Sequence, residues 1–427
     1  MTAPRVFFNF NITPDSHTLS AYQSRGGYQA LAKALKEMQP LDVENEVKAS
    51  GLRGRGGAGF AAGVKWSFVN KKSPVIYLCC NADEGEPGTY KDRWIFEHSP
   101  HQLIEGMVLA SYALHVRHAV IYIRGEFDLP WRRLLEALKE AKEAGYLGEN
   151  ILGSGYSCDI IPHQGGGAYV CGEESSLISS MEGFKGYPKN KPPFPAVKGL
   201  YDAPTVINNV ETLANVPWII SNGAAAYAEM GTEKNKGTKI FGVSGHVVNP
   251  HLLELELGYP LKKVIYEDCG GILGGKALKA VIPGGSSSPI LKASEIETLT
   301  LDIESVAAAG SMLGSGAIIV IAEGTCMVRL LQVLTRFYAH ESCGQCTPCR
   351  EGTSWMNKIV TRISQGKGRK GDIESLESIT KGIMGNTVCA LGDAAAMPVV
   401  NFVKKYRDEF EYFIEHGRSM NDGRLEI

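Results

Sequence analysis

The chain has 427 residues, of which 44% are hydrophobic and 21% are charged, as in ordinary water-soluble globular proteins. The formal net charge of −2 excludes the broad basic field that a nucleic-acid-binding protein presents to phosphates. No apolar run approaches the roughly 18–20 residues of a membrane span, and residues 1–11 lack the features of a targeting leader. We therefore expect a cytosolic chain that is long enough for two or three domains.

Residues 27–231 alternate between helix-like and strand-like segments. The expected helices cover residues 28–38, 42–50, 64–70, 100–116, 128–144, 172–181 and 206–221, and the expected strands cover residues 75–80, 118–124 and 158–162. The strands are apolar throughout and are separated by helices. This pattern predicts an α/β fold in which helices cover both faces of a parallel sheet.

The remainder of the chain has two further patterns. Strand-like segments at residues 239–244, 252–257, 278–282 and 317–321 surround one short helix at 261–267, which predicts a small α+β module. Expected helices then follow at residues 325–340, 348–365, 372–384 and 394–413. Four helices with a cysteine-containing loop between the first two predict a bundle that carries a cluster at one end.

The cysteine-containing loop is the most specific motif of the chain. Cys343, Cys346 and Cys349 are separated by two residues each, and Cys389 follows from elsewhere in the chain. Three cysteines in one loop with a distant fourth are typical of a [4Fe-4S] cluster. A structural zinc site normally uses two separated Cys-x-x-Cys pairs, so zinc and unrelated free thiols are the weaker alternatives.

A glycine-rich loop at residues 54–59 contains the pattern Gly-x-Gly-x-x-Gly. In a Rossmann dinucleotide site this pattern follows a strand, whereas residues 42–50 read as a helix. We therefore expect a loop whose backbone N–H groups approach a phosphate or a ring in another way. A tight turn between domains is the alternative interpretation.

Polar residues follow three further elements and add candidate ligand contacts. Residues 81–88 come directly after the strand at 75–80, where open α/β sheets bind ligands. A second glycine loop at 165–172 leads into a helix that begins with Glu173 and Glu174, which are equally suited to binding and to the positive end of the helix dipole. Asn208 and Asn209 offer amide groups, or act as helix caps.

Charged and aromatic residues near these loops complete the set. Lys65 suits a phosphate and Phe68 suits a planar ring, while Trp66 is more typical of a core position. Lys191 and Phe194 lie in a proline-rich connector that is able to face a ligand. Because no Ser-His-Asp or His-Glu-x-x-His arrangement is present, hydrolytic chemistry is not expected.

Taken together, these motifs resemble the NADH-binding flavoprotein subunit of respiratory complex I, whose bacterial form is the F subunit of NADH:quinone oxidoreductase. The resemblance rests on residues 54–65, 81–93, 165–183, 191–195 and 208–212 and on the four cysteines, in that order along nearly the whole chain. It implies a Rossmann-like FMN- and NADH-binding domain at 1–236, a ubiquitin-like (β-grasp) domain at 237–323 and a helical iron–sulfur domain at 324–427.

The resemblance also implies individual roles. Contacts to FMN are expected from Gly54, Gly56, Gly57, Lys65, Asn81, Asp83, Tyr169, Gly172, Glu173, Asn208, Asn209 and Thr212, with Glu84 among the cofactor-binding residues. NADH is expected near Phe60, Phe68, Glu86, Glu174, Lys191 and Phe194. Cys343, Cys346, Cys349 and Cys389 are the expected [4Fe-4S] ligands. Gly85, Ser175 and Cys79 depart from the common family pattern without touching a defining group.

The implied activity is NADH dehydrogenation without a protein acid or base. Hydride passes from NADH to FMN, Glu86 and Glu174 orient the substrate, and single electrons then reach the [4Fe-4S] cluster and the clusters of partner subunits. The implied partners are the thioredoxin-like [2Fe-2S] E subunit and the large iron–sulfur G subunit, in the peripheral arm on the cytoplasmic side of the inner membrane.

Two other functions remain open from the sequence. The diaphorase subunit of a soluble NAD-dependent hydrogenase or formate dehydrogenase shares the same motifs, although no fused ferredoxin-like cysteines are present. A non-catalytic scaffold that keeps the cluster but has lost flavin is the other, and the intact Lys65, Asp83, Glu173 and Asn208 argue against it.

Overall fold

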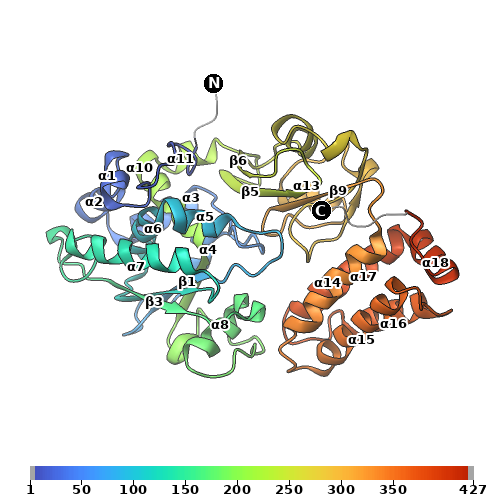
Figure 1. The fold of residues 1–427 in the computed structure, drawn as a ribbon. Helices are drawn as coiled ribbons and strands as arrows, with labels where there is room; N and C mark the ends of the chain where they lie inside the picture. The colour runs from blue at the N-terminus through green and yellow to red at the C-terminus, as the bar shows by residue number, and fades with distance from the viewer. Residues whose placement is uncertain (1–4, 422–427) are drawn as a thin grey trace.

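The computed structural model describes residues 5–421, which form three parts around a common centre (Figure 1). The N-terminal part contains a four-stranded sheet of strand order β3-β2-β1-β4, in which all neighbouring strands are parallel. Its strands are β1 (Tyr77–Ala82), β2 (His118–Ile123), β3 (Asp159–Gln164) and β4 (Thr205–Asn209). The expected α/β class with a parallel sheet is confirmed.

Helices surround this sheet. They are α1 (Leu19–Ser24), α2 (Gln29–Glu37), α3 (Pro40–Ala49), α4 (Ala62–Ser67), α5 (Lys91–His98), α6 (Pro100–Leu114), α7 (Asp128–Glu143), α8 (Glu174–Met181), α9 (Val210–Ala214), α10 (Val216–Asn222) and α11 (Ala224–Ala228). Helix α6 starts with proline at its first turn, which suits that position, and nearly all of its residues are buried. It packs against α3, α7, α9 and β1 and forms the centre of this part's core.

The helix expected at residues 206–221 is wrong in its first turn. Residues Thr205–Asn209 form strand β4, which pairs with β1 so that Asn81 lies opposite Asn209. The run Thr205-Val206-Ile207 is β-branched and buried, which suits a strand. The Asn209 side chain then accepts a hydrogen bond from the Glu211 N–H and begins α9.

The middle part is a five-stranded mixed sheet of order β6-β5-β9-β7-β8. Its elements are β5 (Thr238–Gly245), β6 (Leu252–Glu256), α12 (Leu261–Lys263), β7 (Leu278–Ile282), β8 (Leu291–Lys292), α13 (Ile303–Ala308) and β9 (Ala317–Ala322). Strands β5 and β9 run parallel, and the other pairs are antiparallel. The expected helix at 261–267 is α12 continued by a π-helical turn at Val264–Asp268.

The C-terminal part is helical, with α14 (Met327–Glu341), α15 (Thr347–Ser364), α16 (Asp372–Ile383), α17 (Leu391–Lys405) and α18 (Arg407–His416). Helices α14 to α17 contact one another in a closed ring, which confirms a four-helix bundle. The single helix expected at 394–413 is wrong, because the backbone of Tyr406 (φ −128°, ψ 33°) ends α17 before α18 begins. The Tyr406 ring is buried, with the Lys279 ammonium 5.6 Å from its centre.

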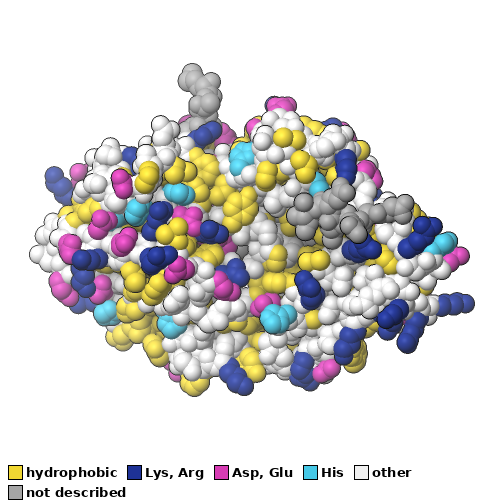
Figure 2. All heavy atoms as spheres, in the orientation of Figure 1, with side chains coloured by type: hydrophobic (Ala, Val, Ile, Leu, Met, Phe, Trp, Pro, Cys, Tyr) yellow, Lys and Arg dark blue, Asp and Glu magenta, His cyan; other side chains and the backbone are white. Residues whose placement is uncertain are grey.

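The surface carries charges of both signs. On the face drawn in Figure 2, Lys and Arg side chains alternate with Asp and Glu over the N-terminal part, and Lys and Arg predominate over the helical part at the right. Within residues 5–421, none of the helices combines the length and the apolar character that a membrane span requires.

The close approach of α6 and α9 generates a stability prediction. A Cβ added at Gly106 would lie 2.1 Å from the Leu213 carbonyl oxygen, so Gly106→Ala forces the two helices apart. We expect a loss of about 1–3 kcal/mol of unfolding free energy, measured by urea denaturation. Gly382→Ala is the matched control, because a Cβ at this exposed position of α16 meets nothing within 4 Å. Equal effects of the two substitutions would contradict the packing argument.

Candidate functional site: a cleft shared by three parts of the chain

A cleft of about 470 Å³ lies where the three parts meet. The N-terminal part contributes the glycine loop, the loop after β1, the segment around Tyr169–Glu173 and Asn209. The middle part contributes residues around Gly284–Ser287 and Met312–Ser315, and the helical part contributes residues between Cys389 and Met397. A ligand in this cleft therefore touches all three parts at once.

The glycine loop is closed at its base by backbone contacts. Arg53 and Ala61 form an isolated antiparallel bridge, and the Gly54 N–H donates to the Phe60 carbonyl oxygen (2.8 Å). Helix α3 precedes the loop, which confirms that it does not follow a strand. A Cβ at Gly56 would lie 3.0 Å from the Asn209 Cβ, so glycine permits the loop to lie against the end of β4.

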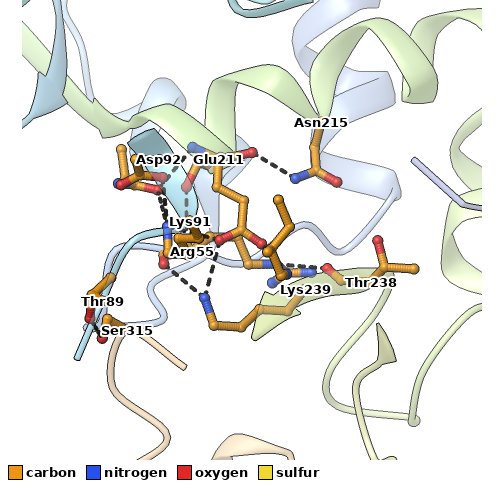
Figure 3. A network of polar contacts seen from close by, with 12 residues as sticks. Arg55, Thr89, Lys91, Asp92, Glu211, Asn215, Thr238, Lys239 and Ser315 are labelled. Carbon is orange, nitrogen blue, oxygen red and sulfur yellow. Dashed lines mark hydrogen bonds and ion pairs between the residues drawn. The ribbon is translucent and has the colours of Figure 1, made fainter. Parts of the chain in front are cut away.

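The side chain of Arg55 points away from the cleft into a buried polar network (Figure 3). Its guanidinium donates to the carbonyl oxygens of Lys236 (2.7 Å) and Thr238 (3.1 Å). Its backbone N–H donates to the Thr212 hydroxyl (2.8 Å), and its carbonyl accepts from the Lys239 ammonium (3.1 Å). The glycine loop is thus fastened to the start of the middle part.

Glu211 lies at the centre of this network (Figure 3). Its fully buried carboxylate is 2.9 Å from the Lys91 ammonium and 3.2 Å from that of Lys239, and it accepts from the Ile240 N–H (2.7 Å). Burial alone would raise the pKa of Glu211, but Lys239 and Lys91 lower it overall, so the carboxylate stays charged. Lys91 also donates to the Asn209 amide oxygen (3.3 Å), which links the network to the cleft.

The carboxyl end of β1 places three polar side chains at the cleft. The Asn81 amide donates to the Gly172 carbonyl oxygen (2.8 Å), which holds the two cleft walls together. Glu84 is buried and accepts from the N–H groups of Asp92 (2.8 Å) and Arg93 (3.0 Å) at the start of α5. Burial, with Asp92 nearby, raises the pKa of Glu84 to about 8.

Asp83 supplies a test of whether the cleft fits a flavin mononucleotide. One of its carboxyl oxygens, Oδ2, is buried and has no hydrogen-bond partner among the described residues. Burial raises the pKa of Asp83 to about 7, although Arg124 opposes this shift. A buried polar atom without a partner is destabilising, and a hydroxyl of the FMN ribityl chain would satisfy it. The cleft residues therefore fit this cofactor.

Beside the cleft, two acidic and two basic residues form ion pairs. Glu173 caps α8 by accepting from the N–H groups of Ser175 and Ser176. The Lys191 ammonium lies 3.0 Å from Glu173 and 2.6 Å from Glu174, and Lys65 lies 3.2 Å from Glu174. Burial alone would raise the pKa of Glu174, but Lys65 and Lys191 lower it overall. Both the capping and the charge interpretations of these residues are therefore realised.

Three aromatic rings near this ion-pair group are exposed. Phe60, Phe68 and Phe194 keep 52%, 59% and 57% of their surface accessible, and the Phe60 and Phe68 ring centres are 6.1 Å apart. Exposed rings of this size are suited to stacking on a base. Trp66, by contrast, is fully buried, which confirms the core position, and its indole N–H donates to the Asn208 amide oxygen (2.8 Å).

The structure brings part of the expected cofactor-binding set into the cleft. The lining residues among the expected ones are Gly56, Gly57, Asn81, Asp83, Glu84, Glu86, Tyr169, Gly172, Glu173 and Asn209. Gly54, Asn208 and Thr212 instead support the lining from behind. Phe60, Lys65, Phe68, Glu174, Lys191 and Phe194 are not among the lining residues.

Sequence reasoning missed the contributions of the other parts. Among the lining residues that it did not select are Thr89, Lys91, Asp92, Gly284, Ser287, Met312, Ser315 and Met397. The run Gly284-Gly285-Ser286-Ser287-Ser288 resembles the glycine loops that were selected, and its composition was the available signal.

The four cysteines converge on a second, smaller pocket. Cys343, Cys346, Cys349 and Cys389 line it together with Pro188, Ser342, Gln345, Thr387, Leu391 and Gly392. Burial raises the pKa of the Cys389 thiol to about 11. Within residues 5–421, no group of three or more His, Cys, Asp or Glu side chains is arranged around a single metal ion. The four thiols surround the pocket instead, as ligands of a four-iron cluster do.

The two cavities share a wall. Cys389 and Leu391, which line the cysteine pocket, also line the large cleft. The segment that begins α17 therefore faces both, and a group bound in the cleft would be separated from the cysteine pocket by these two residues.

Comparisons with known proteins agree with this arrangement. The family model of the Nuo51 FMN-binding domain matches residues 47–218, that of the SLBB domain matches residues 239–320, and that of the NADH-ubiquinone oxidoreductase-F iron-sulfur binding region matches residues 329–413. The chain is 51% identical to one of the F subunits of NADH-quinone oxidoreductase, numbered 2, from Rhizobium meliloti, over 98% of this chain and 99% of that protein. It is 49% identical to the NADH-quinone oxidoreductase F subunit of Mycobacterium bovis, over 96% and 94%.

A solved structure is also similar. A chain of NAD+-reducing [NiFe]-hydrogenase in the H2-reduced state has a TM-score of 0.83 and 33% identity, over 97% of this chain and 71% of that one. The fold and the matches define an oxidoreductase subunit with an FMN-binding domain and a [4Fe-4S]-binding region. The chain belongs to the family of NADH-quinone oxidoreductase F subunits. The resemblance inferred from the motifs is confirmed.

The raised pKa of Asp83 generates a pH prediction for flavin-free protein. The folded pKa of about 7 exceeds the unfolded value of about 3.9, so the folded state binds the proton more strongly. Stability present at low pH is therefore lost as the pH rises from about 4 to about 7. We expect Asp83→Asn to raise the denaturation midpoint of flavin-free protein, by more at pH 8 than at pH 5. A constant difference between the two pH values would contradict the raised pKa.

Proposed function

We propose that this chain is the NADH-oxidising subunit of an NADH:quinone oxidoreductase. The observation that carries the proposal is the wall shared by the cleft and the cysteine pocket, formed by Cys389 and Leu391. When bound, FMN accepts a hydride from NADH and returns single electrons, which a [4Fe-4S] cluster is able to carry onward. Because both sites lie on one chain with a thin separation, electrons need no mobile carrier between them.

In this proposal the chain binds and orients, and supplies no acid or base. Glycines at 54, 56, 57 and 172 let the backbone approach FMN, and Asn81, Asp83, Glu84, Tyr169, Glu173, Asn208, Asn209 and Thr212 hold its polar groups directly or through the loops. Lys65 offsets negative charge in the cleft. Phe60, Phe68 and Phe194 stack against the dinucleotide, and Glu86, Glu174 and Lys191 fix its polar groups.

The domains and partners follow from the same proposal. The flavin domain covers residues 1–236, the β-grasp domain 237–323 and the iron–sulfur domain 324–427, with Cys343, Cys346, Cys349 and Cys389 as cluster ligands. The partners are a thioredoxin-like [2Fe-2S] E subunit and a large iron–sulfur G subunit. The assembled position is the peripheral arm on the cytoplasmic side of the membrane.

A second candidate is the NAD-reducing subunit of a soluble hydrogenase or formate dehydrogenase. The TM-score of 0.83 with a hydrogenase chain favours it. We rank it second because identity to that chain is 33%, against 51% for the Rhizobium relative. Co-purification decides between the two: the first proposal requires quinone reductase subunits in the complex, and the second requires a hydrogenase or formate-oxidising subunit.

The first functional prediction concerns Glu174. Glu174→Gln weakens its pairing with Lys65 and Lys191, which we expect to lower kcat/KM for NADH by about tenfold or more while FMN content stays near normal. The assay is NADH:ferricyanide reductase activity of the complex. Glu182→Gln is the matched control, because Glu182 caps the other end of α8 and pairs with Lys189 instead. Wild-type kinetics in Glu174→Gln would remove Glu174 from the site.

The second functional prediction concerns Cys389. Cys389→Ala removes one proposed cluster ligand, so we expect loss of the cluster's paramagnetic signal and of quinone reduction, while NADH still bleaches the flavin absorbance. The control is Cys269→Ala, a buried thiol in the core of the middle part. Retention of cluster iron and quinone reductase activity in Cys389→Ala would contradict the ligand assignment.

A further inference from the structure

We propose that the turn Gly284–Ser288 of the middle part belongs to the dinucleotide site, and that Ser287 is a positioning residue for Glu86. This inference rests on the proposed function, because it concerns how NADH is held. It assigns the β-grasp part a direct share in substrate binding, in addition to its place between the other two parts.

The contacts on Glu86 carry the inference. One carboxyl oxygen, Oε1, accepts from both the N–H and the hydroxyl of Ser287 (2.7 Å each). The other oxygen, Oε2, accepts from the Tyr169 hydroxyl (2.6 Å). Glu86, Ser287 and Tyr169 all line the cleft. The carboxylate is therefore clamped from two sides by groups that come from different parts of the chain.

The clamp leaves Glu86 able to bind a ligand. A carboxylate offers about four lone-pair positions, and Ser287 occupies those on Oε1. Tyr169 occupies one on Oε2, so that oxygen retains acceptor capacity toward an N–H or O–H group in the cleft. A ribose hydroxyl or a carboxamide N–H of a dinucleotide has the required donor.

The turn fits closely around this carboxylate. Gly285 has a φ of +98°, and a Cβ built there would lie 2.6 Å from the Glu86 Cγ. A Cβ at Gly284 would lie 2.3 Å from the Met312 carbonyl oxygen, so the turn is packed against the second loop of the middle part. Glycines at both positions therefore let the turn reach Glu86 from a fixed base.

The helical part holds the clamp from behind. The hydroxyl groups of Tyr338 on α14 and Ser286 lie 2.9 Å apart, and the Tyr169 N–H donates to the Glu341 carboxylate at the end of α14 (3.0 Å). Burial raises the pKa of Tyr169 well above its usual value, so its hydroxyl keeps the proton that it donates to Glu86. Both partners of Glu86 are thus fixed by α14.

Ser287→Ala tests the inference, with Ser288→Ala as the matched control from the same turn. The Ser288 hydroxyl is buried and has no hydrogen-bond partner among the described residues, and Ser288 is not among the residues lining the cleft. The measurements, on the complex with its partner subunits, are KM and kcat for NADH with ferricyanide, FMN content, and the Kd of NAD+ for oxidised protein by isothermal titration calorimetry.

We expect Ser287→Ala to raise KM and Kd by about threefold to tenfold, the effect of losing one hydrogen bond. We expect kcat and FMN content to stay within about twofold, and Ser288→Ala to match the wild type. In a Glu86→Ala background, Ser287→Ala should change neither KM nor Kd further, because the residue acts through Glu86.

Two results overturn the inference. One is an unchanged KM and Kd in Ser287→Ala, or a loss of FMN alone. The other is the same increase with and without the Glu86 side chain, which would assign Ser287 a purely structural role. If Glu86→Ala itself leaves KM unchanged while NADH still bleaches the flavin, this inference fails and the proposed function stands. If NADH does not bleach the flavin of wild-type protein, the proposed function fails.

Discussion

A fully buried carboxylate, that of Glu211, joins the elements that shape the cleft. Removing a charge from water costs several kcal/mol, and this cost is offset by the ammonium groups of Lys91 and Lys239 and by the Ile240 N–H. Those partners come from α5 and β5, so the interaction exists only when the N-terminal and middle parts are docked. Lys239 also holds the Arg55 carbonyl, and the glycine loop is thereby fixed where a cofactor meets it.

The cleft is an assembly of loops from three parts of the chain, and this explains how two kinds of electron carrier fit on one polypeptide. The N-terminal part supplies the glycine loop and the polar ends of β1 and β4, the middle part closes on Glu86, and the helical part supplies Cys389 and Leu391. The same Cys389 faces the pocket of the other three cysteines. A rigid docking of the parts is therefore a condition for electron transfer, since it sets the thickness of the shared wall.

The features that local sequence could predict are those with a local cause. The cysteine spacing, the helix before the glycine loop and the polar residues after β1 each follow from a short pattern. The strand Thr205–Asn209 was missed because helical periodicity resumes directly after it, and pairing with β1 decides its conformation. The end of α17 at Tyr406 depends on packing against Lys279, and the positions of Thr212 and Ser287 depend on segments far away in the chain. Contacts of this kind leave no periodic signal.

The central claim, that the flavin site and the iron–sulfur site exchange electrons within this chain, is tested most directly by anaerobic reduction with NADH. The measurement follows flavin absorbance and freeze-quenched electron paramagnetic resonance of the same sample, on complex that contains stoichiometric FMN and iron. The account predicts that NADH alone bleaches the flavin and then produces a paramagnetic iron signal that depends on the cysteine pocket. Bleached flavin with no paramagnetic iron from this pocket, even after a stronger reductant is added, would contradict it.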